Sequence, residues 1–334
     1  MNLSVVPAYD AAAARERDAE RVVPGVYADL TFLMKLEFKA RGFSFLPGQP
    51  VRSLLAGRHA SRLRGRGLNF EEIRRYLPGD DTRSMDWRVT ARLQKPHVRV
   101  YTEERDRPAL LIVDQRQTMF FGSRRCMKSV AAAEAAALGA WRVFHAGDRV
   151  GVLVFNDTEL IEIEPRRSRR QVMRILQDIV RLNRQLSAKV SAPPNPGMYN
   201  EALRRAQSLA KHDFLVCTLS DGFGVDQQTG RVFTEMAAHN DMLVGFIFDP
   251  LEAALPDAGR LVFGRADRQL EVNTGSTALR RDYAAGFEER QSLIDRLCRQ
   301  RQAPRLRIST ERDVAEQIRE GLGHVPARAG RVIV

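Results

Sequence analysis

Short apolar runs alternate with amphipathic segments along the last two thirds of the chain. Runs rich in β-branched residues predict strands at residues 109–114, 149–155, 159–163, 214–219 and 242–248. Apolar positions at three- and four-residue spacing predict helices at residues 123–147, 172–182, 200–211, 279–297 and 314–322, and one more between the last two strands. This alternation is typical of an α/β fold. We therefore predict a doubly wound, mostly parallel, Rossmann-type sheet domain over residues 108–334.

The first hundred residues follow a different pattern. Residues 26–39 predict a helix, whereas residues 52–67 hold five arginines, one histidine and no acid, with glycines that interrupt any long element. Residues 88–102 predict an extended segment, because residues 98, 100 and 102 alternate with polar positions. The expected organisation is an N-terminal helix plus a small strand-rich appendage over residues 1–107.

Composition narrows the class of protein. With 334 residues, 44% hydrophobic and 28% charged, the chain can bury a large core, which excludes wholesale disorder and fibrous structure. No window approaches the roughly 18 uncharged apolar residues that would cross a bilayer, and the start of the chain reaches Asp10 and Glu16 without an apolar signal core. We expect a soluble, cytoplasmic protein. Its three cysteines are far apart and unpaired in sequence, so we expect them to be buried apolar residues.

The net charge of +12 raises the alternative of a nucleic-acid or other polyanion partner. Only six of the 53 basic residues are lysines, and such a skew can reflect genomic base composition. Two arginine-rich strips hold the candidate contacts, which are Arg58, Arg62, Arg64, Arg66, Arg166, Arg167, Arg170 and Arg174. Neither strip contains an aromatic residue, so the stacking platforms typical of single-strand binders are missing there.

Motifs for catalysis are absent from the sequence. No lysine follows a glycine, so there is no phosphate-binding Gly-Lys-Ser/Thr step. Neither a Gly-Xaa-Ser-Xaa-Gly elbow nor a His-Glu-Xaa-Xaa-His pair occurs, and the six histidines are scattered singly. The sequence therefore favours a protein that is not an enzyme and needs no cofactor.

Residues 70–92, FEEIRRYLPGDDTRSMDWRVTAR, interleave carboxylates with arginines. Pro78-Gly79 predicts a tight turn. Carboxylates among arginines usually neutralise one another as bidentate pairs, so we predict a network whose members are Asp80, Asp81, Arg83, Asp86, Trp87 and Arg92. A metal site on the three aspartates is the alternative, which the surrounding positive charge opposes. A metal-dependent hydrolase built there would have no visible nucleophile or general base.

Asp114 and Asp221 each follow a predicted inner strand. In doubly wound sheets, ligands bind at the carboxyl ends of the strands. Two carboxylates meeting there suggest a site for a hard cation, and they are equally suited to cap the helices that follow.

The stretch RYLPGDDTRSMDW, followed by TAR, KP, VRVY and ERDRPALLIVD, resembles the bacterial family called domain of unknown function 58. The resemblance is dense from about Gly57 to Asp114 and looser as far as the strand at Met242. It implies a von Willebrand A-like domain that serves as a non-enzymatic interaction module. The implied partner is a MoxR-type AAA+ ATPase acting in protein assembly or maturation, and other von Willebrand A proteins are further candidate partners.

The resemblance also implies a magnesium motif, which this chain alters. Von Willebrand A domains bind the ion through Asp-Xaa-Ser-Xaa-Ser, a threonine and a further aspartate; Asp114, Thr118 and Asp221 match. Arg116 stands at the first hydroxyl position, and Met198 lies near the threonine position. Magnesium requires oxygen ligands, so it would bind only if the altered motif still accepts it. We hypothesise that Arg116 is a built-in cation that pairs with Asp114 and Asp221; the alternative is that it points into solvent.

Overall fold

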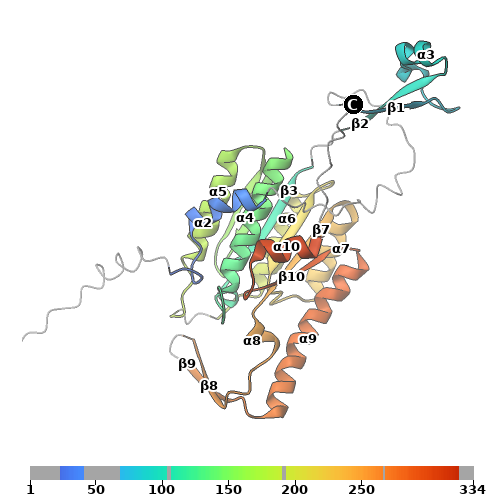
Figure 1. Cartoon of the computed structure of the whole chain (residues 1–334). Coiled ribbons are helices and arrows are strands. Elements are labelled where there is room, and N and C mark those ends of the chain that lie inside the picture. Colours follow the sequence, from blue (N-terminus) through green and yellow to red (C-terminus); the bar gives the residue numbers. More distant parts are fainter. Residues whose placement is uncertain (1–22, 41–67, 104–106, 190–192, 266–267, 323–334) are drawn as a thin grey trace, which may run out of the picture. The chain divides into compact units, whose positions relative to one another are not determined.

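The computed structural model describes residues 23–40, 68–103, 107–189, 193–265 and 268–322 (Figure 1). Two compact units divide the chain, one of residues 1–49 and 107–334 and the other of residues 50–106. Helix α2 (Leu30–Lys39) belongs to the larger unit, because Leu33 and Leu36 are buried in that unit's core. The sequence groups this helix with the N-terminal appendage over residues 1–107, but the helix belongs to the larger unit.

A six-stranded sheet forms the centre of the larger unit. Its strand order is β10 (Arg305–Ser309), β7 (Asp241–Phe248), β6 (Leu215–Ser220), β3 (Ala109–Asp114), β4 (Val150–Phe155) and β5 (Leu160–Arg166). All neighbours are parallel except β4 and β5, which form an antiparallel hairpin. The prediction of an α/β fold with a mostly parallel sheet is confirmed.

Helices cover both faces of this sheet (Figure 1). On one face lie α2, α4 (Lys128–Ala146), α5 (Arg169–Asn183) and α10 (Val314–Leu322); on the other lie α6 (Gly197–Leu209), α7 (Gln227–His239) and α9 (Thr277–Gln300). Strand β3 is buried along its whole length, with Leu111 and Val113 in one core cluster and Leu110 and Ile112 in the other. Successive side chains of a strand point to opposite faces, so a strand covered on both sides must be continuously apolar.

Most predicted elements of this unit are present with shifted ends. Three strands were not predicted, namely β10 and the hairpin of β8 (Arg260–Arg265) and β9 (Arg268–Asn273), and neither was the short helix α8 (Pro250–Ala253). Strand β10 contains only two apolar residues, Leu306 and Ile308, both buried beside β7. The three cysteines are buried and unpaired, as predicted. None of the described helices combines the length and apolarity needed to cross a membrane.

The described residues of the smaller unit form a two-stranded antiparallel ribbon and one helix. Strands β1 (Leu68–Arg75) and β2 (His97–Glu103) pair, and the 3-10 turn η2 (Thr82–Ser84) and helix α3 (Trp87–Leu93) lie between them in sequence. The prediction of an extended segment from residue 88 is wrong for its first half. Asp86 begins the helix there, because its Oδ1 accepts hydrogen bonds of 3.1 Å from the amides of Arg88 and Val89.

Candidate functional site

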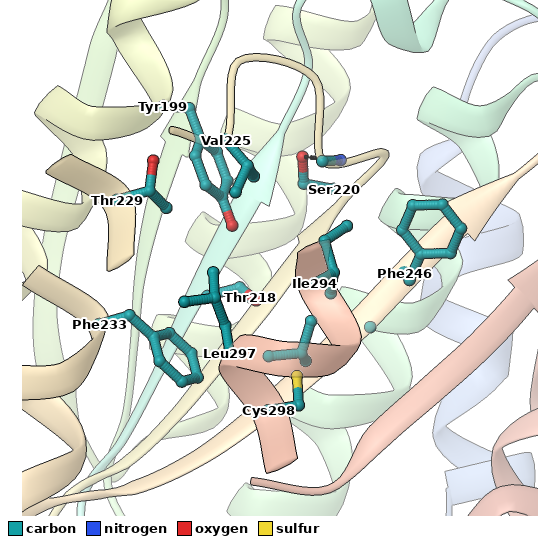
Figure 2. Close-up of a pocket in the computed structure, with 13 residues that line it drawn as sticks. Tyr199, Thr218, Ser220, Val225, Thr229, Phe233, Phe246, Ile294, Leu297 and Cys298 are labelled. Carbon is teal, nitrogen blue, oxygen red and sulfur yellow. Dashed lines mark hydrogen bonds between the residues drawn. The ribbon is translucent and has the colours of Figure 1, made fainter. Parts of the chain in front are cut away.

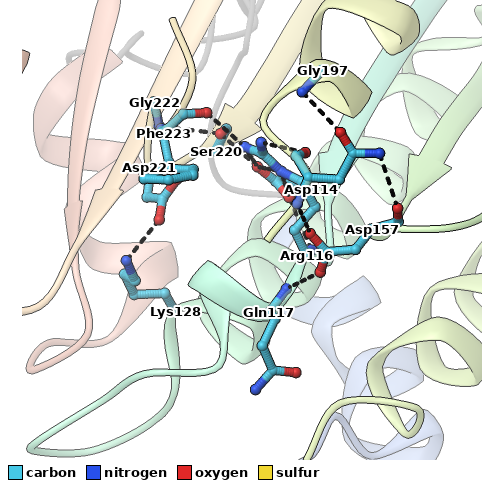
Figure 3. Close-up of polar contacts among 11 residues, drawn as sticks. Asp114, Arg116, Gln117, Lys128, Asp157, Gly197, Ser220, Asp221, Gly222 and Phe223 are labelled. Carbon is cyan, nitrogen blue, oxygen red and sulfur yellow. Dashed lines mark hydrogen bonds and ion pairs between the residues drawn. The ribbon is translucent and has the colours of Figure 1, made fainter. Parts of the chain in front are cut away.

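Asp114 and Asp221 meet at the carboxyl edge of the sheet (Figure 3). Asp114 is the last residue of β3, and Asp221 directly follows β6, the parallel neighbour of β3. Both residues are buried, with exposed fractions of 0% for Asp114 and 1% for Asp221. Buried carboxylates are stable in their charged form only when hydrogen-bonded or paired, so each must have a cationic or donor partner.

Arg116 is the partner of Asp114. Its Nε donates to Oδ1 at 3.0 Å and its Nη2 to Oδ2 at 2.6 Å, while Oγ of Ser220 donates to the same Oδ2 at 2.7 Å. The Arg116 side chain is fully buried, and its guanidinium lies over the ring of Phe155, 5.5 Å from the centroid. Burial alone would lower the pKa of Arg116, but the adjacent charge of Asp114 outweighs it, so the pKa is raised. Arg116 is thus a permanent buried cation and does not point into solvent.

Lys128, the first residue of α4, is a second buried cation at this edge. Its Nζ lies 2.8 Å from both Oδ2 of Asp221 and Oε1 of Glu252. Burial favours the neutral form of Asp221, but the charges of Lys128 and then Arg116 prevail and hold the pKa of that carboxyl below its usual range. Arg116 therefore bonds directly to Asp114 and acts on Asp221 only through its charge. Lys128 is not among the site residues that the sequence predicts.

The residues at this edge do not fit a magnesium ion. Each carboxylate that the motif would offer already faces a buried cation, and a cation in that position repels the ion. Oγ1 of Thr118 is buried without a hydrogen-bond partner among the described residues. Met198 is half-buried and packs against the apolar cluster on the α6 side of the sheet. Within the described ranges, no group of three or more His, Cys, Asp or Glu side chains is placed to hold a metal.

Three loops converge on the Arg116 guanidinium. The loop after β3 carries it, and Nη2 donates to the carbonyl of Phe223 at 2.9 Å in the loop after β6. The carbonyl of Asn195, before α6, lies 3.5 Å from Nη1. Asp157 reinforces the same junction, because its carboxylate accepts from the amides of Gln117 at 2.6 Å and Asn195 at 2.7 Å. One buried side chain thus fixes the relative positions of the loops that form this edge.

A small cavity lies between the sheet and α9 (Figure 2). Its lining is mostly apolar and includes Tyr199, Phe233, Phe246, Ile294 and Cys298. The cavity volume is about 20 Å³, room for roughly one water molecule. Burial raises the pKa of Tyr199 to about 12, so its hydroxyl is not poised to act as a base. The cavity is too small for an organic substrate.

In the smaller unit, the aspartates are paired with arginines other than those predicted. Asp80 accepts from Nη1 and Nη2 of Arg74, each at 2.7 Å, and these hydrogen bonds lower its pKa to about 2. Asp86 accepts from Nε of Arg99 at 2.8 Å. Asp81 caps η2 through the amide of Arg83 at 2.9 Å.

The remaining members of the predicted network lie on the surface. The side chains of Arg83 and Arg92 are exposed and form no ion pair with the described residues, and Trp87 is 69% exposed. The prediction that these three side chains belong to the network is therefore wrong. Two of the three carboxylates of the alternative metal site, those of Asp80 and Asp86, are bound by guanidinium groups.

Only the second of the two arginine-rich strips lies within the described residues. Arg58, Arg62, Arg64 and Arg66 lie outside the described residues. Arg166, Arg167 and Arg170 are exposed, and Nε of Arg174 lies 4.0 Å from the carboxylate of Asp178 one turn along α5. The second strip is thus a solvated basic surface at the start of α5.

Comparisons with known proteins place the chain in a family. The chain is 29% identical over 283 residues to the uncharacterized proteins Rv1480 of Mycobacterium tuberculosis and Mb1516 of Mycobacterium bovis, covering 84% of this chain and 86% of each relative.

Among solved structures, the conserved hypothetical protein BatB of Bacteroides thetaiotaomicron aligns with a TM-score of 0.39 and 12% identity, over 63% of this chain and 93% of that one. An aerotolerance-related membrane protein of Bacteroides fragilis aligns with a TM-score of 0.40 and 10% identity, over 65% of this chain and 98% of that one. Likenesses this weak carry no argument about function. The family model described as protein of unknown function DUF58 matches residues 72–292, and the chain belongs to that family.

Proposed function

We propose that this chain is a non-enzymatic protein-interaction module, accessory to a MoxR-type AAA+ ATPase in protein assembly or maturation. In this proposal, the carboxyl edge of the sheet is the interaction surface, and fixed cations stand where related domains use a metal ion. The observation that carries the proposal is the fully buried pair of Arg116 with Asp114. The ATPase as partner follows from the family resemblance alone.

The buried ion pairs argue against catalysis at this edge. A general base must be able to accept a proton near neutral pH. Asp221 is bound by Lys128 and its pKa is held below the usual range, and Asp114 is bound by Arg116 and Ser220. Asp221 is therefore not suited to take a proton from a substrate, and both oxygens of Asp114 already accept hydrogen bonds from Arg116.

The same pairs favour a preformed docking surface. Binding costs less when the loops of an interface are already ordered. The Arg116 guanidinium joins the loops that hold Asp114, Phe223 and Asn195, and it does so without an exchangeable ion. The surface should therefore keep its shape whatever the magnesium concentration.

A pull-down with charge-reversed variants tests the proposal. Arg124 is exposed in the loop after β3, at the carboxyl edge, whereas Lys211 is exposed before β6, at the opposite edge. The tagged chain, Arg124→Glu and Lys211→Glu are each incubated with nuclease-treated native lysate, washed at moderate salt and analysed by mass spectrometry. We expect an AAA+ ATPase with the unmodified chain and with Lys211→Glu, and about tenfold less with Arg124→Glu, which corresponds to about 1.4 kcal/mol.

Three other outcomes would contradict the proposal. Recovery of no AAA+ ATPase by any of the three proteins would remove the proposed partner. Abundant nucleic acid before nuclease treatment, with no protein retained after it, would instead make the arginine-rich strips the functional surface. Equal losses for both variants would mean that net charge, not the carboxyl edge, controls the interaction.

A further inference from the structure

The outward side of α3 carries an exposed tryptophan beside two arginines. Trp87, Arg88, Ala91 and Arg92 occupy positions i, i+1, i+4 and i+5, which lie within about 140° of arc on a helix with 3.6 residues per turn. All four are exposed. The opposite side faces β2, because Oγ1 of Thr90 accepts a hydrogen bond of 3.0 Å from the amide of His97.

Packing within the small unit does not account for this tryptophan. Among the side chains described there, only Val98 and Asp86 are fully buried. Leu77 and Leu93 are 56% and 49% exposed. Two of its aspartates are instead paired with the partly exposed arginines Arg74 and Arg99. Large exposed apolar side chains on such a unit indicate a contact surface.

Charge defines the chemistry of the partner. The described part of the unit exposes Arg75, Arg83, Arg88, Arg92 and Lys95. Among residues 73–99, whose side chains the structure describes, Asp80 and Asp86 are each bound by an arginine, and Asp81 is the one exposed acid. The surface around Trp87 is therefore strongly positive, and it complements a negatively charged partner.

We infer that the outward side of α3 is a docking site for an acidic protein segment that places an apolar side chain against Trp87. Tryptophan and arginine are the residues most enriched in the energetic centres of protein interfaces. A single-stranded nucleic acid would need several rings for successive bases, and Trp87 is the one exposed aromatic among the described side chains of this unit. The inference rests on the proposed function as an interaction module, but it concerns a different surface from the sheet edge.

The two tryptophans of the chain provide a direct optical test. Trp141 is 0% exposed, so Trp87 is the residue that a dissolved quencher reaches. In the full-length protein, we expect iodide to quench Trp87 several-fold more strongly than caesium, because nearby arginines attract the anion and repel the cation. Trp87→Phe should abolish the fluorescence that iodide quenches, and Arg88→Glu/Arg92→Glu should make caesium the stronger quencher. A Trp87 that neither ion quenches would overturn the inference, because the surface would then already be covered.

A binding titration then tests the partner's chemistry. The probes are an amphipathic Glu/Leu peptide, a Lys/Leu peptide of the same length and pattern, and oligodeoxythymidylate. We expect the acidic peptide alone to shift the Trp87 emission to the blue and protect it from acrylamide, with affinity at least about tenfold lower for Arg88→Glu/Arg92→Glu, or about 1.4 kcal/mol.

Absence of protection by the acidic peptide, or tighter binding of the oligonucleotide, would overturn the inference. Because the readout is local to Trp87, either result leaves the Arg124→Glu pull-down unaffected. Loss of ATPase capture with peptide binding retained would count against the proposed function alone.

Discussion

The two units of this chain use the same aspartate–arginine chemistry in opposite surroundings. In the α/β domain, the side chains of Asp114 and Arg116 are both 0% exposed, whereas in the small unit those of Arg74 and Asp80 are 37% and 20% exposed. Water can replace a lost partner in the second pair but not in the first. Hydrogen-bond geometry alone therefore does not measure what a pair contributes; the first pair should support the domain, and the second should hold a single turn.

The largest expected effect comes from breaking the buried pair. Asp114→Ala leaves the Arg116 guanidinium buried without its counter-charge, so we expect a loss of about 3–5 kcal/mol in the free energy of unfolding. Urea denaturation followed by circular dichroism measures it. The control, Asp114→Leu/Arg116→Met, removes both charges and should recover most of the loss. A loss below about 1 kcal/mol for Asp114→Ala would place this pair with the exposed ones.

Lys128→Met should have the next largest effect. This change leaves Asp221 buried beside Glu252 without a cation, so we expect a loss of about 3 kcal/mol in the free energy of unfolding. This value is the lower end of the range for a broken buried pair, because the side chain of Glu252 is 14% exposed and lies 3.6 Å from Arg290. The same denaturation experiment measures it, with Lys211→Met as the control on the exposed surface. An unchanged midpoint would show that Lys128 does not compensate Asp221.

The buried pair of Lys128 and Asp221 also predicts the pH dependence of stability. The pKa of Asp221 is lowered from 3.8, so its contribution is present above that value and is lost as the pH falls below it. The pKa of Lys128 is raised from 10.5, so its contribution is present below that value and is lost as the pH rises above it.

We therefore expect the contribution of this pair to the stability of the unmodified chain to be nearly constant from about pH 5 to 9. Lys128→Met should instead gain stability as the pH falls from 7 to about 5, because the unpaired Asp221 then favours its neutral form. Differential scanning calorimetry across the range distinguishes the two profiles. Parallel profiles would contradict the proposed role of the ammonium.

The smallest effect is expected for the exposed pair. Asp80→Asn removes the carboxylate that accepts from Arg74 and from the amide of Leu77 at 2.8 Å. We expect no measurable change in the urea midpoint of the α/β domain, but faster amide exchange at Leu77, as detected by hydrogen–deuterium exchange. Asn keeps the side-chain volume, and Thr82→Ser, an exposed change two residues along, is the control. Unfolding of the whole chain by Asp80→Asn would contradict the comparison.

The sequence predicted the layout of the sheet better than the contacts at its edge. Burial on both faces makes a strand such as residues 109–114 continuously apolar, so these strands are visible in one dimension. The alternation of residues 98, 100 and 102 predicts β2 equally well, but it does not extend back to residue 88, because Asp86 caps a helix that begins at Trp87.

The partners of the aspartates depend on the three-dimensional structure. Asp80 and Asp86 bind Arg74 and Arg99, which come from two paired strands, and the sequence suggested nearer arginines. Lys128 reaches Asp221 across 93 residues. One signal for it was available, because Lys128 and Glu134 are the only charges in the otherwise apolar run KSVAAAEAAALGAW, and charges in a helix that is buried all round need partners.

The central claim is that Arg116 and Lys128 occupy the place of a metal ion, and magnesium binding tests it most directly. Thermal midpoints are measured in millimolar MgCl₂ and in NaCl of equal ionic strength, for the unmodified chain, Arg116→Ser and Arg116→Ser/Lys128→Met. We expect no magnesium-specific shift in the unmodified chain, a rise in Arg116→Ser because a hydroxyl replaces the cation beside Asp114, and a larger rise in the double variant. A magnesium-specific rise in the unmodified chain, reversed by EDTA, would contradict the account.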